Sequence, residues 1–218
     1  MFPLKDENPT SITPFMTWLL IGLNVVIFVW EIIGGTDRFN TIIMSYGLTP
    51  ARIISGEAYY TFLTSMFLHG GIFHLGGNML YLYIFGDNIE DICDHLPYLV
   101  FYLICGIIAS LTHMLSAWGS NVPTVGASGA ISGILGAYVL FFPKVKIRTA
   151  VTFGWLIRIV YVPAYALIGL WFVYQFALAL LAVETGVAYW AHIGGFLAGI
   201  ALARIYGRRK YYHPLYKG

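Results

Sequence analysis

Residues 126–136 read GASGAISGILG. The four glycines of this stretch are three and four residues apart, so they fall on one face of a helix. Faces of small residues let membrane helices pack closely against each other. A matching pair of glycines, four residues apart, lies in the apolar segment that begins near residue 190. We therefore predict direct contact between these two helices through Gly126, Gly129, Gly133, Gly136, Gly195 and Gly199.

Composition places these helices in a membrane. Of the 218 residues, 59% are hydrophobic and 10% are charged, and the mean hydropathy is +0.76. A soluble domain this apolar would lack the polar surface that keeps it dispersed. About 20 helical residues cross the hydrocarbon core of a bilayer, and the charge-free runs predict an all-α, polytopic bundle of six transmembrane helices. The predicted spans are 14–33, 72–89, 96–115, 127–142, 161–182 and 190–206, in a single membrane domain covering residues 1–218.

Basic residues predict the orientation of the bundle. Of the 12 Lys and Arg residues, all but Arg38 and Arg52 lie before the first span, between the fourth and fifth spans, or after the start of the sixth. Because positive residues stay on the cytoplasmic side, we expect a multi-pass protein of the cell membrane with both termini in the cytoplasm. The net charge of +2 is then a signal of topology, and we expect no nucleic-acid partner.

The cysteines and histidines do not indicate a disulfide or a metal site. Cys93 falls in the cytoplasmic loop after the second span and Cys105 within the third, so the two thiols face different environments and are expected to pack as ordinary residues. The chain has no His-Glu-x-x-His pattern, and His69 and His74, five residues apart, would splay on a helix. We therefore expect no metal ion and no cofactor.

Polar residues gather at the outer ends of three predicted spans. If the amino terminus is inside, spans two, four and six all enter the membrane from outside. Their outer ends carry the least membrane-compatible polar side chains, at similar depth. Intramembrane polar groups are costly and mark functional sites. These residues are His69, His74, Asn78, Ser128 and His192.

Ser128 and His192 suit the roles of nucleophile and base in a hydrolase. A serine hydroxyl attacks well only when a base takes its proton, and histidine is the natural base near neutral pH. The developing oxyanion needs fixed donors. The Asn78 amide, the His74 imidazole and the unpaired backbone N–H of Ser128 at a helix start can supply them. Glu184 is the only acid placed to act as the third member of a catalytic triad, and it is better interpreted as a solvated charge in a loop.

Water must reach Ser128 below the outer surface of the membrane. The fourth span offers about 15 residues from Ser128 onward, or ~22 Å of helix, whereas a hydrocarbon core is about 30 Å thick. Ser128 is therefore expected several ångströms below the outer surface. The loop at 116–123 leaves room for water, and His69 and His74 are expected to help hydrate the pocket.

Taken in order, these segments resemble the motifs of the rhomboid family of intramembrane serine proteases. HLGGN at 74–78 is similar to the family's HxxxN, GASG at 126–129 to its GxSG, and AHIGGFLAG at 191–199 to its AHxxGxxxG. The resemblance implies a Ser128–His192 dyad with His74 and Asn78 in the oxyanion hole. It also implies that the substrates are single transmembrane segments in the lipid bilayer, cut near the outer surface. The alternative is a non-catalytic rhomboid-fold protein that binds client membrane segments, although such relatives typically lack the Ser or the His present here.

Two positions depart from the family pattern. The loop before the second span usually carries a Trp-Arg pair after a glutamate, but here Glu57 is followed by Ala-Tyr-Tyr, which puts the anchoring of this loop in question. Four residues after the nucleophile the family commonly has an aromatic that stacks on the histidine, and here Ser132 stands there. We expect either Tyr189 or Trp190 to hold the imidazole, or a loosely held ring and a slow enzyme. The Ser132 hydroxyl could then recruit a water, and Ser132→Phe is expected to keep or raise turnover.

Overall fold

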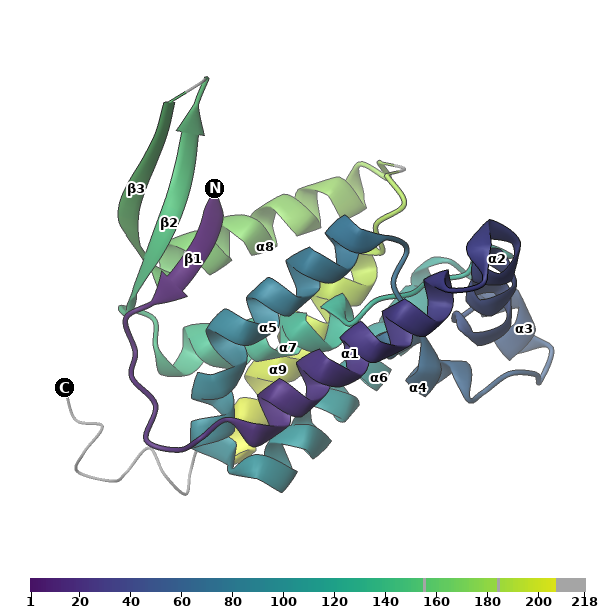
Figure 1. The fold of residues 1–218 in the computed structure, drawn as a ribbon, viewed down its shortest axis with the longest axis horizontal. Coiled ribbons are helices and arrows are strands. Elements are labelled where there is room, and N and C mark those ends of the chain that lie inside the picture. Colours follow the sequence, from purple (N-terminus) through teal and green to yellow (C-terminus); the bar gives the residue numbers. More distant parts are fainter. Residues whose placement is uncertain (155, 184, 207–218) are drawn as a thin grey trace.

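Six long helices lie where the six spans are predicted (Figure 1). The computed structural model describes residues 1–154, 156–183 and 185–206. Within this part, α1 and α6 are each long and apolar enough to cross a bilayer, and α7 and α8 are shorter apolar helices. The long helices are α1 (Phe15–Ile32), α5 (Ile72–Cys93), α6 (His95–Ser116), α7 (Ser128–Phe141), α8 (Ala164–Leu180) and α9 (Tyr189–Tyr206).

Helix α7 forms the centre of the bundle. Every residue from Gly129 to Tyr138 is buried, and α7 contacts α5, α6 and, most extensively, α9. The glycines bring the two backbones into contact: a Cβ built on Gly199 would lie 1.9 Å from the carbonyl oxygen of Gly133, and one on Gly195 would lie 2.0 Å from that of Gly129. The predicted contact between α7 and α9 is therefore present. At these glycines the two helix backbones are so close that only a hydrogen atom fits between them.

The outer helices expose apolar faces instead of polar ones. Four apolar side chains of α1 are each about half or more exposed: Trp18, Leu19, Val26 and Ile32. Only a minority of the residues in the apolar stretches of α1 and α6 is buried within the protein. Exposed apolar surfaces this continuous mark contact with a partner or a membrane. The outside of the bundle is apolar, whereas its core, around α7, contains glycine and polar residues. This arrangement fits a bundle that is surrounded by lipid.

The chain is mostly helical, as predicted, but a three-stranded antiparallel sheet that the all-α prediction did not include lies at one end of the bundle (Figure 1). The central strand pairs with the amino-terminal strand on one side and with the third strand on the other, with Lys5 opposite Arg148. The sequence by itself indicates only a group of basic residues between the fourth and fifth spans, but this segment forms two strands, and residues 146–149 alternate between exposed and buried as in a strand. Helix α8 consequently begins at 164 rather than 161. The strands are β1 (Phe2–Asp6), β2 (Lys146–Phe153) and β3 (Leu156–Pro163).

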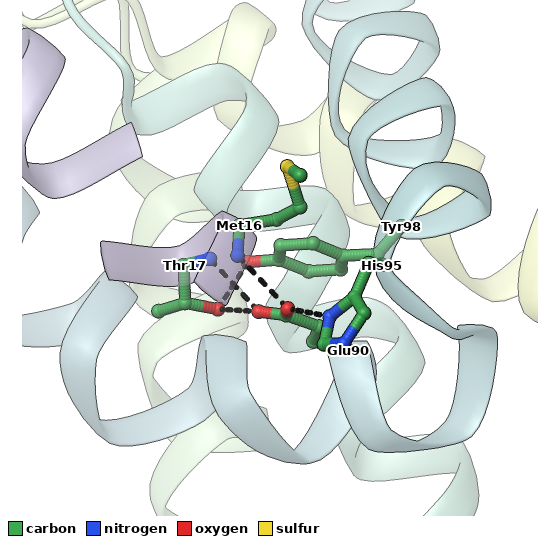
Figure 2. A network of polar contacts seen from close by, with 5 residues as sticks. All are labelled: Met16, Thr17, Glu90, His95 and Tyr98. Carbon is green, nitrogen blue, oxygen red and sulfur yellow. Dashed lines mark hydrogen bonds and ion pairs between the residues drawn. The ribbon is translucent and has the colours of Figure 1, made fainter. Parts of the chain in front are cut away.

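A buried carboxylate fastens the start of α1 to α5 and α6 (Figure 2). Glu90 accepts hydrogen bonds from the backbone N–H groups of Met16 and Thr17 at 2.9 and 2.8 Å and from the Thr17 hydroxyl at 2.7 Å. The ring of His95 lies 2.5 Å from the same carboxylate. Negative charge is favourable at a helix amino terminus, where N–H groups lack partners. Nearby, Asp91 binds the backbone N–H and the hydroxyl of Ser11, so the acids at this end are structural.

The segment between α1 and α5 folds into short helices rather than an open loop. Arg52 donates to the carbonyl of Met44 at 2.9 Å, and the Tyr60 hydroxyl donates to that of Ser45 at 3.0 Å. The rings of Trp30, Tyr46 and Tyr60 follow one another edge to face. These contacts anchor the segment without the Trp-Arg pair. The elements are α2 (Gly35–Tyr46), α3 (Pro50–Ile54), α4 (Thr61–Thr64) and a short 3-10 helix, η1 (Ser65–Phe67).

Candidate functional site

The side chains of Ser128 and His192 meet where α7 and α9 begin. His192 Nε2 lies 2.7 Å from Ser128 Oγ. Ser128 is the first residue of α7, and His192 lies in the first turn of α9. The close approach depends on the adjacent glycine contact between Gly129, the residue after Ser128, and Gly195, about one turn after His192. A hydroxyl and an imidazole nitrogen at this distance can share a proton.

The imidazole of His192 is held from its other side by α8. Its Nδ1 lies 2.9 Å from Oε1 of Gln175, and the Trp171 ring centroid lies 5.9 Å from that of the imidazole. His192 is 8% exposed. The expectation of a loosely held ring, or of one held by a neighbour on the sixth span, is therefore wrong: Trp190 packs on Phe176, and the hydroxyl of Tyr189 contacts Thr185.

Sequence reasoning missed Gln175. It is the only amide side chain in α8, a helix without charged residues, and it lies one helical turn from Trp171 on the same face. A single strongly polar group in an apolar span is a candidate functional residue, and that signal was available in the sequence.

Helix α5 supplies two side chains that can donate hydrogen bonds, Asn78 and His74. The amide nitrogen Nδ2 of Asn78 is buried and has no hydrogen-bond partner in the described part of the chain. Nδ1 of His74 accepts a hydrogen bond from the backbone N–H of Gly70 at 3.4 Å. In a neutral imidazole the proton is then on Nε2. Both side chains line the same cavity as Ser128, and the first N–H groups of α7 have no acceptor within the helix.

Gly126 was predicted as a helix-packing residue, but it lies in the turn before α7. Its φ is +132°, and a Cβ there would lie 2.9 Å from Nε2 of His74 and 3.6 Å from Oγ of Ser128. Its backbone N–H donates to the carbonyl of Ser65 at 2.9 Å. The missing side chain therefore makes room for the His74 ring beside the nucleophile.

Replacing Gly126 with alanine is expected to reduce Ser128 reactivity about 100-fold or more, because small displacements of reacting groups are costly. The methyl group would displace His74 and force a residue with a Cβ into a glycine conformation. The measurement is the rate of Ser128 labelling by a fluorophosphonate. Gly119→Ala is the matched control, since Gly119 also has a positive φ, +76°, but open space around it. Equal labelling of the two variants would contradict this assignment.

Two supporting residues behave differently from their predicted roles. His69 is fully buried, its ring nitrogens have no hydrogen-bond partner in the described chain, and it is not among the residues that line the cavity. Burial and the neighbouring His74 lower the pKa of His69 to about 4. It stays neutral, and its ring supports that of His74 edge to face at 5.2 Å. The hydroxyl of Ser132, which is 1% exposed, donates to the carbonyl oxygen of Ser128 at 2.6 Å, so its proton is engaged within α7.

A cavity of about 990 Å³ opens onto these residues. Its wall includes Ser128, His192, His74 and Asn78, together with residues of the loop at 116–123 that was expected to admit water. The wall also includes His113, near the end of α6, whose Nε2 lies 2.7 Å from the Thr124 hydroxyl. The site can therefore hold water and a peptide bond beside the nucleophile. Glu184, the acid considered as a third member, lies outside the described residues.

Comparisons with known proteins agree with these motifs. The family model described as "Rhomboid domain" matches residues 56–209. The chain is 35% identical over 125 residues to the rhomboid protease GluP of Bacillus subtilis, covering 57% of this chain and 24% of that protein. It is 27% identical over 222 residues to the rhomboid protease AarA of Providencia stuartii, covering 94% and 77%. It is 26% identical over 217 residues to the mitochondrial Rhomboid protein 1 of Saccharomyces cerevisiae, covering 91% and 57%.

The chain spans about a quarter of the length of GluP and 57% of the length of the yeast protein. The family match nevertheless covers well over half of this chain and contains all three motif segments, at 74–78, 126–129 and 191–199. The chain belongs to the rhomboid family.

Proposed function

We propose that this chain is an intramembrane serine endopeptidase that cuts transmembrane segments near the outer membrane surface. The observation that carries the proposal is the 2.7 Å separation of Ser128 Oγ and His192 Nε2 at the wall of a cavity. All six long helices are proposed to cross the bilayer. In this arrangement the apolar outer faces of α1 and α6 contact lipid, while the polar residues of α5, α7 and α9 face one another.

The first half of the proposed reaction forms an acyl-enzyme. Oγ of Ser128 attacks the carbonyl carbon of the scissile peptide bond while Nε2 of His192 takes the hydroxyl proton. The negative charge that develops on the carbonyl oxygen is met by the Asn78 amide, the His74 Nε2–H and the backbone N–H of Ser128. The C–N bond then breaks, and His192 gives its proton to the departing amine.

The second half releases the other product. A water molecule from the cavity gives a proton to Nε2 of His192 and attacks the acyl carbon. The ester bond to Ser128 Oγ breaks, and the serine regains its proton from the imidazole. His113 and Thr124 add polar groups to the wall of the cavity, which supports a supply of water to this step.

Asn78→Ala is expected to lower turnover by about 10²- to 10³-fold with a small change in KM. The amide is expected to bind a charge that exists only in the transition state, so its loss affects turnover rather than ground-state binding. His74→Ala is expected to behave in the same direction. Steady-state kinetics with a transmembrane substrate measure both constants, and Asn40→Ala, an exposed residue of α2, is the control. An increase in KM alone would make Asn78 a packing or binding residue.

Substrates are proposed to enter between α5 and α8. A second cavity, of about 440 Å³, lies there and is lined by Tyr81 and Phe85 of α5 and by Trp171 and Tyr174 of α8. Gln175 lines this cavity and is also hydrogen-bonded to His192 of the site. Apolar walls suit a transmembrane segment that approaches sideways from lipid.

The proposal is tested by reconstituting the purified chain into lipid vesicles with a panel of single-span membrane proteins. Cleavage near the outer end of the span, mapped by mass spectrometry and absent in Ser128→Ala, would support it. Binding of the same segments without cleavage and without fluorophosphonate labelling of Ser128 would instead favour the non-catalytic, client-binding alternative.

Both termini are proposed to face the cytoplasm of a cell membrane. The sheet that carries Lys5 and Arg148 lies at one end of the bundle, and α2 and α3, which carry Arg38 and Arg52, lie at the other (Figure 1). On a background without Cys93 and Cys105, Lys5→Cys should resist an impermeant maleimide in intact cells, whereas Asn121→Cys should react. The reverse pattern would place Ser128 near the cytoplasmic face.

A further inference from the structure

Gln175 is a buried polar residue for which an ordinary packing role gives no reason. It is 7% exposed in the middle of apolar α8. Burying an amide costs free energy unless it forms hydrogen bonds. The hydrogen bond that its oxygen accepts is the 2.9 Å contact with Nδ1 of His192. The polar group of Gln175 is therefore paired with the imidazole of His192 in the site.

We propose that Gln175 is a positioning residue that holds His192 in the tautomer able to accept the Ser128 proton, an inference that rests on the proposed function. The side-chain oxygen of Gln175 can only accept a hydrogen bond. Nδ1 of His192 must then carry the ring proton, which leaves the lone pair of Nε2 facing Ser128 Oγ at 2.7 Å. The hydroxyl donates to that lone pair, and this is the arrangement from which the proton can be transferred.

The opposite amide orientation would disable the base. If the amide nitrogen of Gln175 faced the ring, it would donate to Nδ1, and the neutral imidazole would carry its proton on Nε2. That nitrogen could then donate to Ser128 but could not take its proton. The geometry therefore assigns to one glutamine the tautomer choice that an acid makes in a Ser-His-Asp triad.

Helix α8 supplies both contacts that hold the imidazole. Trp171 and Gln175 are four residues apart, one turn along the same face, and both contact His192. Helix α8 packs on α9 and only slightly on α7. An outward movement of α8 that admits a substrate would withdraw both contacts, so the base is correctly oriented only when α8 is seated.

Two variants separate hydrogen bonding from packing. Gln175→Leu substitutes an apolar side chain of similar size and so removes the hydrogen-bond acceptor. Gln175→Glu keeps an acceptor oxygen in the same place. Val173→Leu, at an exposed apolar position of the same helix, is the matched control. The readouts are kcat and KM for a transmembrane substrate and the rate of Ser128 labelling by a fluorophosphonate. Labelling reports the nucleophile without requiring a bulky substrate to enter.

Gln175→Leu is expected to lower both kcat and the labelling rate by about 10- to 100-fold, with a small change in KM, because a misdirected base is costly. Gln175→Glu is expected to restore most of that loss. The other titratable groups that face His192 are His74 from α5 and His113 from α6, and its contacts from α7 and α8 are uncharged. A carboxylate at 175 favours the imidazolium, so the rise of activity should move to higher pH.

The outcomes distinguish this inference from the proposed function. If the wild-type chain neither cleaves substrates nor reacts with the fluorophosphonate, the proposed function fails. If the wild type is active and Gln175→Leu labels at the same rate, or raises KM alone, Gln175 is a packing or entry residue and the inference is overturned. Should Gln175→Leu fail to fold, an unchanged pH profile of Gln175→Glu would overturn it equally.

Discussion

Ser128→Ala and His192→Ala are each expected to reduce cleavage of a transmembrane substrate by roughly 10⁶-fold, to the background rate. The Ser128 hydroxyl lies in the same cavity wall as the two α5 donors, and the His192 imidazole is hydrogen-bonded to it at 2.7 Å. Because the two groups act as one unit, the double variant is expected to be no slower than either single variant. End-point cleavage assays over several hours, with wild type diluted serially, set the lower limit of detection.

The comparison requires folded protein. Ser116→Ala, on an exposed position of α6, is the control for removal of a serine hydroxyl and should cleave at the wild-type rate. Both inactive variants should keep the thermal unfolding midpoint of the wild type in detergent within a few degrees. Cleavage by folded Ser128→Ala at anything near the wild-type rate would rule out the serine mechanism.

Gly199→Ala is expected to destabilise the protein by about 3 kcal/mol or more, at the upper end of what overpacking costs. The added Cβ would lie 1.9 Å from the carbonyl oxygen of Gly133 and 2.6 Å from its Cα. Both atoms belong to the backbone, so no side-chain rotation can relieve the clash, and α7 and α9 must move apart. That movement would also separate Ser128 from His192, so labelling of Ser128 should fall with stability.

Gly169→Ala on α8 is the matched control, since nothing lies within 4 Å of a Cβ at that position. It should stabilise the helix slightly, by about 0.5–1 kcal/mol, because alanine favours helix over glycine. Denaturant titration in mixed micelles measures both variants. A Gly199→Ala protein as stable as Gly169→Ala would mean that α7 and α9 are farther apart than the glycine contacts indicate.

The long helices and the family were predictable from the sequence because both depend on local patterns. A helix presents residues three and four apart on one face, so the glycine spacing at 129 and 133 already defines a packing face. Helix boundaries followed from charges and prolines next to apolar runs, and the predicted and observed bounds of α1, α6 and α7 differ by one residue at each end. The motif around Ser128 is likewise a short continuous segment.

The sheet and several site residues depend on contacts between distant parts of the chain. Strand β1 pairs with a segment about 145 residues away, and a strand at the very amino terminus has no local signal of its partner. Gly126 was assigned to the packing face because its spacing continues that of Gly129. Its actual neighbour, His74, comes from α5, and the spacing within one helix carries no information about it.

The sequence by itself determined which segments become the six long helices, that these belong to a membrane protein of the rhomboid family, and which serine and histidine to examine. Only the tertiary structure decided how the histidine is held. Ser132 lies on the same helix as Ser128, and its spacing raises the question whether a residue at this position holds the imidazole. Its hydroxyl instead forms a hydrogen bond within its own helix. The contacts come from Trp171 and Gln175 on α8, because an imidazole buried between helices is oriented by whichever neighbour reaches it in space.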